Sequence, residues 1–227
     1  MVSDPAFRCS PDHDNILVDG KTVRKKELVY IVMNKPVGVV TTRSDERGSE
    51  TVYDILGDVG RWVFPVGRLD KDTSGLLFFT NDNQFGETLT NPASQVPKTY
   101  RVRLNNPFDR DDIDIVRQGM LLDGERLLPA EAIRFQGPQD EYWIQMTIVE
   151  GKNRQIRRMC GALGYTVLEL RRTRIGPIEV EDLSVGKWKY LTKQEVLALA
   201  NLESNPTARK LPSFAALHRE YQLGTRT

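Results

Sequence analysis

The stretch Gly67-Arg68-Leu69-Asp70-Lys71-Asp72-Thr73-Ser74-Gly75-Leu76-Leu77-Phe78-Phe79 places a polar loop with two carboxylates directly before a fully apolar run. Such a run is typical of a central strand that is buried on both faces. The segment 62–69, before the acidic positions, also has the character of a strand. Two buried strands would hold the backbone of this loop rigidly while Asp70 and Asp72 face outward, which is how an active-site loop is built.

The segments on either side of this loop predict short strands and helices in alternation. Apolar patterning and turn signals predict strands at 28–33, 98–104, 120–148, 167–170 and 178–180, and helices at about 83–90, after Asp109, at 153–163 and after Thr192. Residues 52–56 have helical spacing, with Ser49 as the expected N-cap. Asp19-Gly20 and Asp123-Gly124 are hairpin signals. Because hairpins outnumber long crossovers, we expect an α+β fold with a mixed, mostly antiparallel sheet.

Composition limits the chemistry that the chain can perform. Its 227 residues can build a core without disulfides or metals, and a formal net charge of +1 means that any grip on nucleic acid is a local patch. Cys9 and Cys160 form no recognisable pair, and His13 and His218 lie near the termini, which argues against histidine catalysis and zinc sites. The N-terminus has no apolar signal region and no stretch is a membrane span, so we expect a cytoplasmic protein.

Three segments of the chain differ in character. Residues 1–25 are predicted to be a polar lead-in that ends in a short hairpin, residues 26–200 the catalytic domain, and residues 201–227 a polar tail whose role the sequence does not show.

The predicted helix at 153–163 is strongly basic. On a helical wheel its apolar stripe consists of Ile156, Met159, Cys160 and Leu163. Arg154 and Arg158 then point to the far side, free to meet phosphates, whereas Arg157 lies on the shoulder and can deliver its guanidinium to the edge of a cleft. Positive charge continues in the nearby residues Arg171, Arg172 and Arg174. A solvated basic helix face is the plainer interpretation of the same charges.

A third segment, Lys98-Thr99-Tyr100, is predicted to lie on a strand with Lys98 and Tyr100 on one face. A lysine and a tyrosine together suit a surface that binds phosphate and stacks on bases. Taken alone, a tyrosine at position 100 would more often be an ordinary half-buried strand aromatic.

The residues of the acidic loop also allow other interpretations. Asp, Lys, Ser and Gly favour ordinary solvated turns. Asp70, Asp72 and Ser74 copy the first half of a calcium-binding EF-hand loop, but the closing position falls on Asn81, which has no carboxylate. A metal-dependent phosphodiesterase using Asp70, Asp72 and Asp82 conflicts with the basic residues beside these acids. We therefore expect no metal site.

The ordered set of motifs resembles the RsuA/RluB/RluE/RluF-type family of pseudouridine synthases, and the late segment is most similar to the RluF branch. The resemblance extends over most of residues 28–199. It rests on Asn34-Lys35-Pro36-Val37-Gly38, the segment from Gly67 to Leu77, Lys98-Thr99-Tyr100, Asn153-Arg154-Gln155-Ile156-Arg157-Arg158-Met159, Gly164-Tyr165, Arg172-Thr173-Arg174-Ile175-Gly176 and Gly186-Lys187-Trp188.

This resemblance implies a fold with two subdomains that flank a central RNA-binding cleft. It also implies a reaction without metal or cofactor, in which uridine in RNA is detached at N1, turned and rejoined through C5. Asp70 would be the nucleophile, Tyr100 would stack on the base and assist removal of the C5 proton, and Arg157 would pair with Asp70 as the third catalytic residue. Arg68 would hold RNA around the extruded nucleotide. We expect Lys35, Lys98, Arg154, Arg158, Arg172 and Arg174 to contact the RNA as well.

These roles agree with physical expectation. A base inside a helix must be extruded at a cost of a few kcal/mol, and an aromatic face offsets part of it. A guanidinium beside a buried carboxylate keeps it ionised and nucleophilic. Attack at C1′ of the ribose and attack at C6 of the base both remain open.

The resemblance also has one gap. Members of the family commonly carry an N-terminal S4 RNA-binding module, and residues 16–23 look only like its final strand pair. We therefore expect a remnant of this module in a short or truncated member of the family. The expected substrate is ribosomal RNA, from the large subunit (23S), bound by a monomer. A non-catalytic ribosome-assembly factor on the same fold is the alternative.

Overall fold

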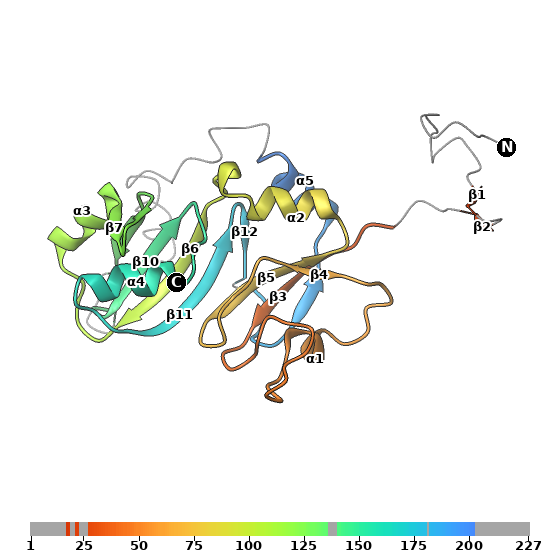
Figure 1. Ribbon diagram of the computed structural model, residues 1–227, viewed down its shortest axis with the longest axis horizontal. Coiled ribbons are helices and arrows are strands. Elements are labelled where there is room, and N and C mark those ends of the chain that lie inside the picture. The colour runs from red at the N-terminus through yellow and green to blue at the C-terminus, as the bar shows by residue number, and fades with distance from the viewer. Residues whose placement is uncertain (1–16, 19–20, 23–26, 136–139, 181, 203–227) are drawn as a thin grey trace, which may run out of the picture.

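The computed structural model describes residues 17–18, 21–22, 27–135, 140–180 and 182–202 (Figure 1). At the N-terminus, β1 (Leu17–Val18) and β2 (Lys21–Thr22) pair antiparallel, which confirms the two strands of the first predicted hairpin. The Asp19-Gly20 turn, the rest of the polar lead-in up to residue 26 and the tail from residue 203 lie outside the described residues.

A nine-stranded sheet forms the body of the molecule, with the order β13-β3-β5-β11-β6-β10-β9 and with β4 and β12 paired to β5 and β11. Among the described strands, every pair is antiparallel except β5 with β11, which confirms the α+β, mostly antiparallel prediction. The strands of this sheet are β3 (Tyr30–Lys35), β4 (Phe64–Val66), β5 (Ser74–Thr80), β6 (Lys98–Leu104), β9 (Glu131–Arg134), β10 (Trp143–Ile148), β11 (Val167–Ile175), β12 (Ile178–Glu179) and β13 (Trp188–Tyr190). A separate hairpin of β7 (Met120–Leu122) and β8 (Glu125–Leu127) turns at Asp123-Gly124, as predicted.

The helices are α1 (Val52–Leu56), α2 (Asn83–Thr90), the 3₁₀ turn η1 (Pro92–Ser94), α3 (Arg110–Gln118), α4 (Gln155–Ala162) and α5 (Lys193–Ala200). Asp109 caps α3 and Thr192 opens α5 with a capping box, as predicted. The cap of α1 is Thr51 rather than Ser49, because Thr51 forms a reciprocal capping box with Asp54. The strand predicted at 62–69 is confined to Phe64–Val66.

The core lies on both faces of the sheet, and β5 contributes to both. Leu77 and Phe79 pack into one cluster with Ile156 and Met159 of α4, whereas Leu76 and Phe78 pack into the other. The second cluster also takes up apolar side chains of α2 and α5, which lie together on one side of the sheet (Figure 1). A strand with apolar residues at every position can satisfy both layers, which explains the unbroken apolar run.

The parallel contact between β5 and β11 joins the two halves of the sheet. It pairs Ser74 with Arg171 and Gly75 with Arg172. A Cβ atom at Gly75 would lie 2.1 Å from the backbone oxygen of Arg172, and the φ of Gly75 is +106°. Only glycine therefore allows the two strands to meet here. The acidic loop ends at this junction, so the joint between the two halves also positions the loop.

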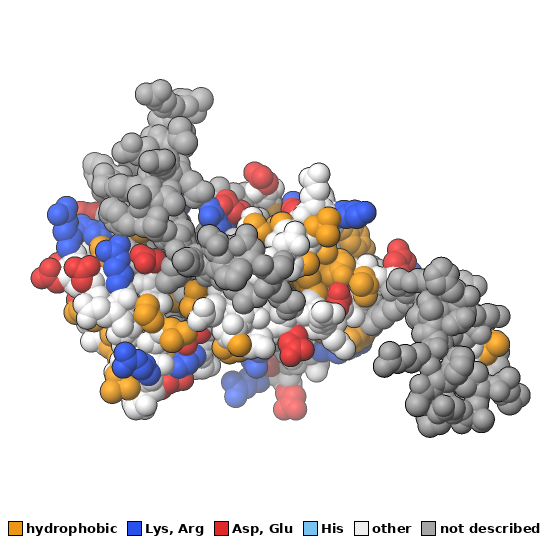
Figure 2. Space-filling model, turned by 90° about the horizontal axis from the view of Figure 1, so that it is seen from above, with side chains coloured by type: hydrophobic (Ala, Val, Ile, Leu, Met, Phe, Trp, Pro, Cys, Tyr) orange, Lys and Arg blue, Asp and Glu red, His pale blue; other side chains and the backbone are white. Residues whose placement is uncertain are grey.

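The described surface has a balanced charge. Acidic and basic side chains lie interspersed over the face seen in Figure 2, in keeping with the net charge of +1. A grip on a polyanion must therefore come from a local group of cations. Among the described residues, no helix has the length and apolar character that crossing a membrane requires.

Candidate active site

A cleft of about 550 Å³ opens where the two halves of the sheet meet. The acidic loop, β6, β11, the end of α2 and the turn before α4 line this cleft. A second hollow, of about 490 Å³, lies between the loop and the segment after β3 and shares Arg68, Leu69, Asp70 and Arg154 with the first. Asp70 is thus reached from both hollows, at the boundary between them.

Hydrogen bonds to its backbone carbonyls hold the loop that carries Asp70. The Thr41 hydroxyl donates to the Leu69 carbonyl at 2.8 Å, and the Gly38 N–H donates to the Lys71 carbonyl at 2.8 Å. The Thr73 N–H closes the turn by donating to the Asp70 carbonyl at 3.1 Å. The prediction that Asp70 and Asp72 face outward from this loop is confirmed. The Asp70 side chain is 37% exposed, however, so the expectation of a buried carboxylate is wrong.

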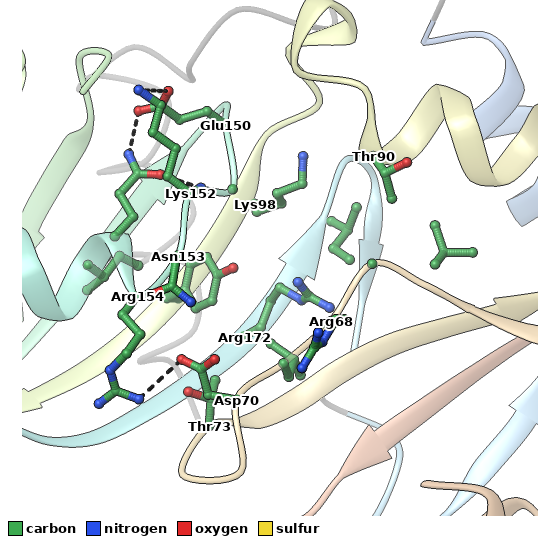
Figure 3. Close-up of a pocket in the computed structure, with 18 of the residues that line it drawn as sticks. Arg68, Asp70, Thr73, Thr90, Lys98, Glu150, Lys152, Asn153, Arg154 and Arg172 are labelled. Carbon is green, nitrogen blue, oxygen red and sulfur yellow. Dashed lines mark hydrogen bonds and ion pairs between the residues drawn. The ribbon is translucent and has the colours of Figure 1, made fainter. Parts of the chain in front are cut away.

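The guanidinium that contacts Asp70 belongs to Arg154 and not to Arg157. Arg154 Nη1 lies 3.4 Å from Asp70 Oδ2, and the same guanidinium donates to both carboxylate oxygens of Asp72, at 3.2 and 3.1 Å. Figure 3 shows the Arg154 side chain reaching across to Asp70. The predicted pairing of Arg157 with Asp70 is therefore wrong for this structure.

The local backbone explains this difference. The α4 helix begins at Gln155, and Arg154 is its N-cap with a φ of +48°. A residue in this left-handed conformation does not follow the helical wheel. Its side chain therefore leaves the predicted far side of the helix and turns toward the acidic loop.

Arg157 holds the acidic loop instead. Its Nη2 atom donates to the backbone carbonyl of Asp72 at 2.9 Å and lies 3.2 Å from the Asp72 carboxylate. Its Nη1 atom donates to the Val167 carbonyl of β11 at 3.0 Å. With a side chain only 13% exposed, Arg157 fastens the loop to both α4 and β11.

Asp72 is the carboxylate with the most basic neighbours in this cluster. Partial burial acts to raise the pKa of Asp72, but the hydrogen bond from Arg154 and the positive charge of Arg157 outweigh it and hold the pKa below its usual value. Asp72 therefore stays ionised and keeps both guanidinium groups beside the Asp70 loop.

Tyr100 lies in the same cleft, as predicted, on β6 beside Arg172 of β11. It is mostly buried and packs into the larger core cluster. Lys98 lies on the same face of β6 and also lines the cleft, together with Arg68 and Arg172. Figure 3 shows Arg68 and Arg172 on the side of Asp70 opposite to Arg154.

The other predicted RNA contacts lie elsewhere. Lys35 is fully buried, and its ammonium donates to the Pro36 and Val39 carbonyls at 3.0 and 2.7 Å, so the prediction that it contacts RNA is wrong. Burial lowers the pKa of Lys35 to about 8, although the charges of Asp72 and Asp70 act to raise it. Arg158 pairs with Glu125 at 2.7 Å, and Arg174 pairs with Glu179. Neither arginine is among the residues that line the two hollows.

Two residues absent from the predicted site form the turn that carries Arg154. The buried Glu150 carboxylate accepts hydrogen bonds from the Leu128 N–H at 2.8 Å and from Gln155 Nε2 at 2.7 Å. Gln155 Oε1 accepts one from the Lys152 N–H at 3.2 Å. A glutamate and a glutamine flanking a glycine-containing turn are the only sign of this arrangement in the sequence. In the described part of the chain, no group of three or more His, Cys, Asp or Glu side chains could hold a metal ion.

Comparison with known proteins connects this geometry to a family. A family model described as RNA pseudouridylate synthase matches residues 29–162. The ribosomal large subunit pseudouridine synthase B of Bacillus subtilis is 35% identical over 83% of this chain and 78% of that protein. The dual-specificity RNA pseudouridine synthase RluF of Escherichia coli is 34% identical over 91% and 72%. Because these two identities are nearly equal, they do not decide between the RluB and RluF branches of the family.

A crystal structure of a pseudouridylate synthase has the same fold. It superposes with a TM-score of 0.70 and 32% identity, over 87% of this chain and 85% of that one. The expected two-part fold around a cleft is thereby confirmed. The chain therefore belongs to the RNA pseudouridylate synthase family, whose members are isomerases that convert uridine in RNA to pseudouridine.

Proposed function

We propose that this chain converts uridine to pseudouridine in large-subunit ribosomal RNA, with Asp70 as the nucleophile. The observation that carries the proposal is the placement of Asp70: an accessible carboxylate on a rigid loop, in contact with Arg154, in a cleft that it shares with Tyr100. The name of the Bacillus subtilis relative supports the large ribosomal subunit as the source of the substrate. We place the catalytic unit at residues 26–200 and expect it to act as a monomer in the cytoplasm.

In the proposed reaction the target nucleotide leaves its stack and enters the cleft, where the ring of Tyr100 packs against the base. An Asp70 oxygen forms a bond to C1′ of the ribose or to C6 of the base, and the N1–C1′ bond breaks. The base turns, a C5–C1′ bond forms, the Asp70 bond is released, the C5 proton leaves and N1 takes up a proton. The product is an isomer of the substrate, so the atoms balance without any co-reactant.

The surrounding cations take different roles in this proposal. Arg154 lies beside the negative charge of Asp70, and Arg157 holds the loop in place. Arg68, Lys98 and Arg172 line the cleft and are the proposed RNA contacts. Lys35 is buried with its ammonium held by the Pro36 and Val39 carbonyls, and its charge interacts with those of Asp70 and Asp72. Arg158 and Arg174 are each occupied by a carboxylate and are assigned no RNA contact.

The test is to incubate the purified chain with transcripts of large-subunit and small-subunit ribosomal RNA and to map pseudouridine by carbodiimide modification and primer extension. We expect a new stop at one or a few uridines of the large-subunit transcript, and none with Asp70→Asn. Modification of the small-subunit transcript alone would reject the proposed substrate. A persistent stop with Asp70→Asn would reject the proposed nucleophile.

A further inference from the structure

The strand side of the cleft carries two cations whose charge is not balanced locally. Lys98 of β6 and Arg172 of β11 both line the cleft. The Lys98 ammonium donates to the Val96 carbonyl at 2.9 Å, and Arg172 Nε donates to the Leu76 carbonyl at 2.7 Å. Arg172 is 4% exposed, and its Nη2 atom is buried without a hydrogen-bond partner among the described residues.

The acidic residues that line the cleft are engaged elsewhere. Asp70 contacts Arg154, and Glu150 is held by Gln155 and Lys152. In the ion pairs of the described chain, no carboxylate lies within salt-bridge distance of Lys98 or Arg172. Burial, together with the charge of Arg172, lowers the pKa of Lys98 to about 8. The two cations therefore destabilise each other in the free protein, a cost that a bound anion would remove.

We propose that Lys98 and Arg172 form a subsite for one phosphate group of the RNA backbone, next to the target nucleotide and separate from the Asp70–Arg154 pair. The inference rests on the proposed function and specifies how the substrate is held. Uracil and ribose present only neutral oxygen atoms, whereas a phosphate supplies the missing negative charge and several acceptors for an ammonium and a guanidinium. The exposed Arg68 at the rim of the cleft can add a third donor.

A purely structural role is the competing explanation, because Arg172 also bonds the backbone of β5. The test therefore uses Lys98, whose ammonium has one hydrogen-bond partner among the described residues, the nearby Val96 carbonyl. Lys98→Met keeps the length and apolar stem of the side chain and removes the charge. Arg103→Gln is the control, since Arg103 lies on the opposite face of β6 and pairs with the exposed Glu169.

All proteins in the binding experiment carry Asp70→Asn, so that RNA binds without conversion. The dissociation constant for a large-subunit ribosomal RNA transcript is measured by fluorescence anisotropy over a range of KCl concentrations. With Lys98→Met we expect affinity to fall roughly 10- to 100-fold and the slope of log K against log salt to flatten by about 0.7–0.9, the value for one lost phosphate contact. Arg103→Gln should leave the slope unchanged.

An unchanged slope with Lys98→Met, an equal change with both variants, or no binding of the transcript would contradict the subsite. A failure of the proposed function looks different, because pseudouridine would then be missing from the reaction of the wild-type chain whatever Lys98 contributes to binding.

A second measurement uses small molecules in place of a folded RNA. Uridine 3′,5′-bisphosphate and uridine are compared, at equal millimolar concentrations, for the rise in melting temperature that each gives the wild-type chain. The bisphosphate should give the larger rise, and Lys98→Met should remove most of the difference. Equal shifts for the two compounds, or a difference that survives in Lys98→Met, would overturn the proposal.

Discussion

The two walls of the cleft carry charge in opposite ways. On the loop wall, the carboxylates of Asp70 and Asp72 are balanced by the guanidinium groups of Arg154 and Arg157. On the strand wall, Lys98 and Arg172 have no carboxylate partner among the described residues. The carboxylates of the first wall have their charge partners without a ligand, as suits a nucleophile that must be held in position. The cations of the second wall need a negatively charged ligand, as suits side chains that bind the RNA backbone.

Apart from loss of the nucleophile itself, the largest effect is expected at Tyr100, which lies between the two walls. Tyr100→Ala removes a stacking surface worth about 1–3 kcal/mol per base, so kcat/KM should fall roughly 10- to 100-fold. Tyr100→Phe keeps the ring and should lose far less. Steady-state kinetics on the mapped transcript would measure both, with melting temperatures to detect damage to the core that Tyr100 joins. Equal losses in the two variants would remove the stacking role.

The unpaired positive charges on the strand wall should make the free energy of unfolding depend on pH. The pKa of Lys98 is about 8 in the folded chain and 10.5 in its reference state. Between these values the unfolded chain binds the additional proton, so stability rises with pH in this window. We expect the wild type to gain on the order of 1–3 kcal/mol over Lys98→Met between pH 8 and pH 10.5. Urea unfolding at several pH values would measure this gain. If the difference in unfolding free energy between the two proteins did not change with pH, the positive charge of Lys98 would not be destabilised in the folded chain.

The loop wall can be tested by comparing two neighbouring arginines of α4. Arg157→Ala removes three contacts that hold the Asp72 segment and β11, so it should lower the free energy of unfolding by about 1–3 kcal/mol and reduce turnover by misplacing Asp70. Arg158 is itself more exposed than Arg157, so Arg158→Ala, which removes pairs with Asp123 and Glu125, should cost less than about 1 kcal/mol. Similar losses for both arginines, measured by urea unfolding, would show that Arg157 is not the clamp.

The smallest effect is expected from Asp72 in acid. Its folded-state pKa is depressed, so the stability that it contributes is present above its unfolded pKa and is lost as pH falls through the folded value. Because Asp72 is half exposed, its contribution should be about 1 kcal/mol or less. Asp72→Asn should therefore be slightly less stable than the wild type at pH 7, and the gap should close only as pH falls below 3.8, through the lower pKa of the folded state. A difference in stability that persists in acid would show that the substitution acts through packing and not through the charge of Asp72.

Strands and helix caps were predictable where local patterning decides them. The apolar run of β5 and the caps at Asp109 and Thr192 are set by periodicity and by side-chain hydrogen bonds near in sequence. The motifs also placed Asp70, Tyr100, Arg68 and Lys98 around one cleft. These features depend on neighbours a few residues away, which a single sequence displays directly.

The ion pairs were not predictable, because they depend on one backbone angle and on distant partners. A helical wheel assigns Arg154 to the outer face, but its positive φ turns the side chain toward a loop more than 80 residues earlier in the chain. Lys35 likewise looks like an available cation at the end of a strand until the chain folds its own carbonyl groups around it. Neither feature leaves a periodic signal in the sequence.

The central claim is that Asp70 is the nucleophile in this cleft, and release of tritium from RNA labelled at C5 of uridine tests it most directly. The matched control is Asp111→Asn, which alters an exposed carboxylate on α3 away from both hollows. We predict that Asp70→Asn retains its fold and its melting temperature but releases no tritium above background, whereas Asp111→Asn releases it like the wild type. Tritium release by Asp70→Asn at a rate near that of the wild type would contradict the account.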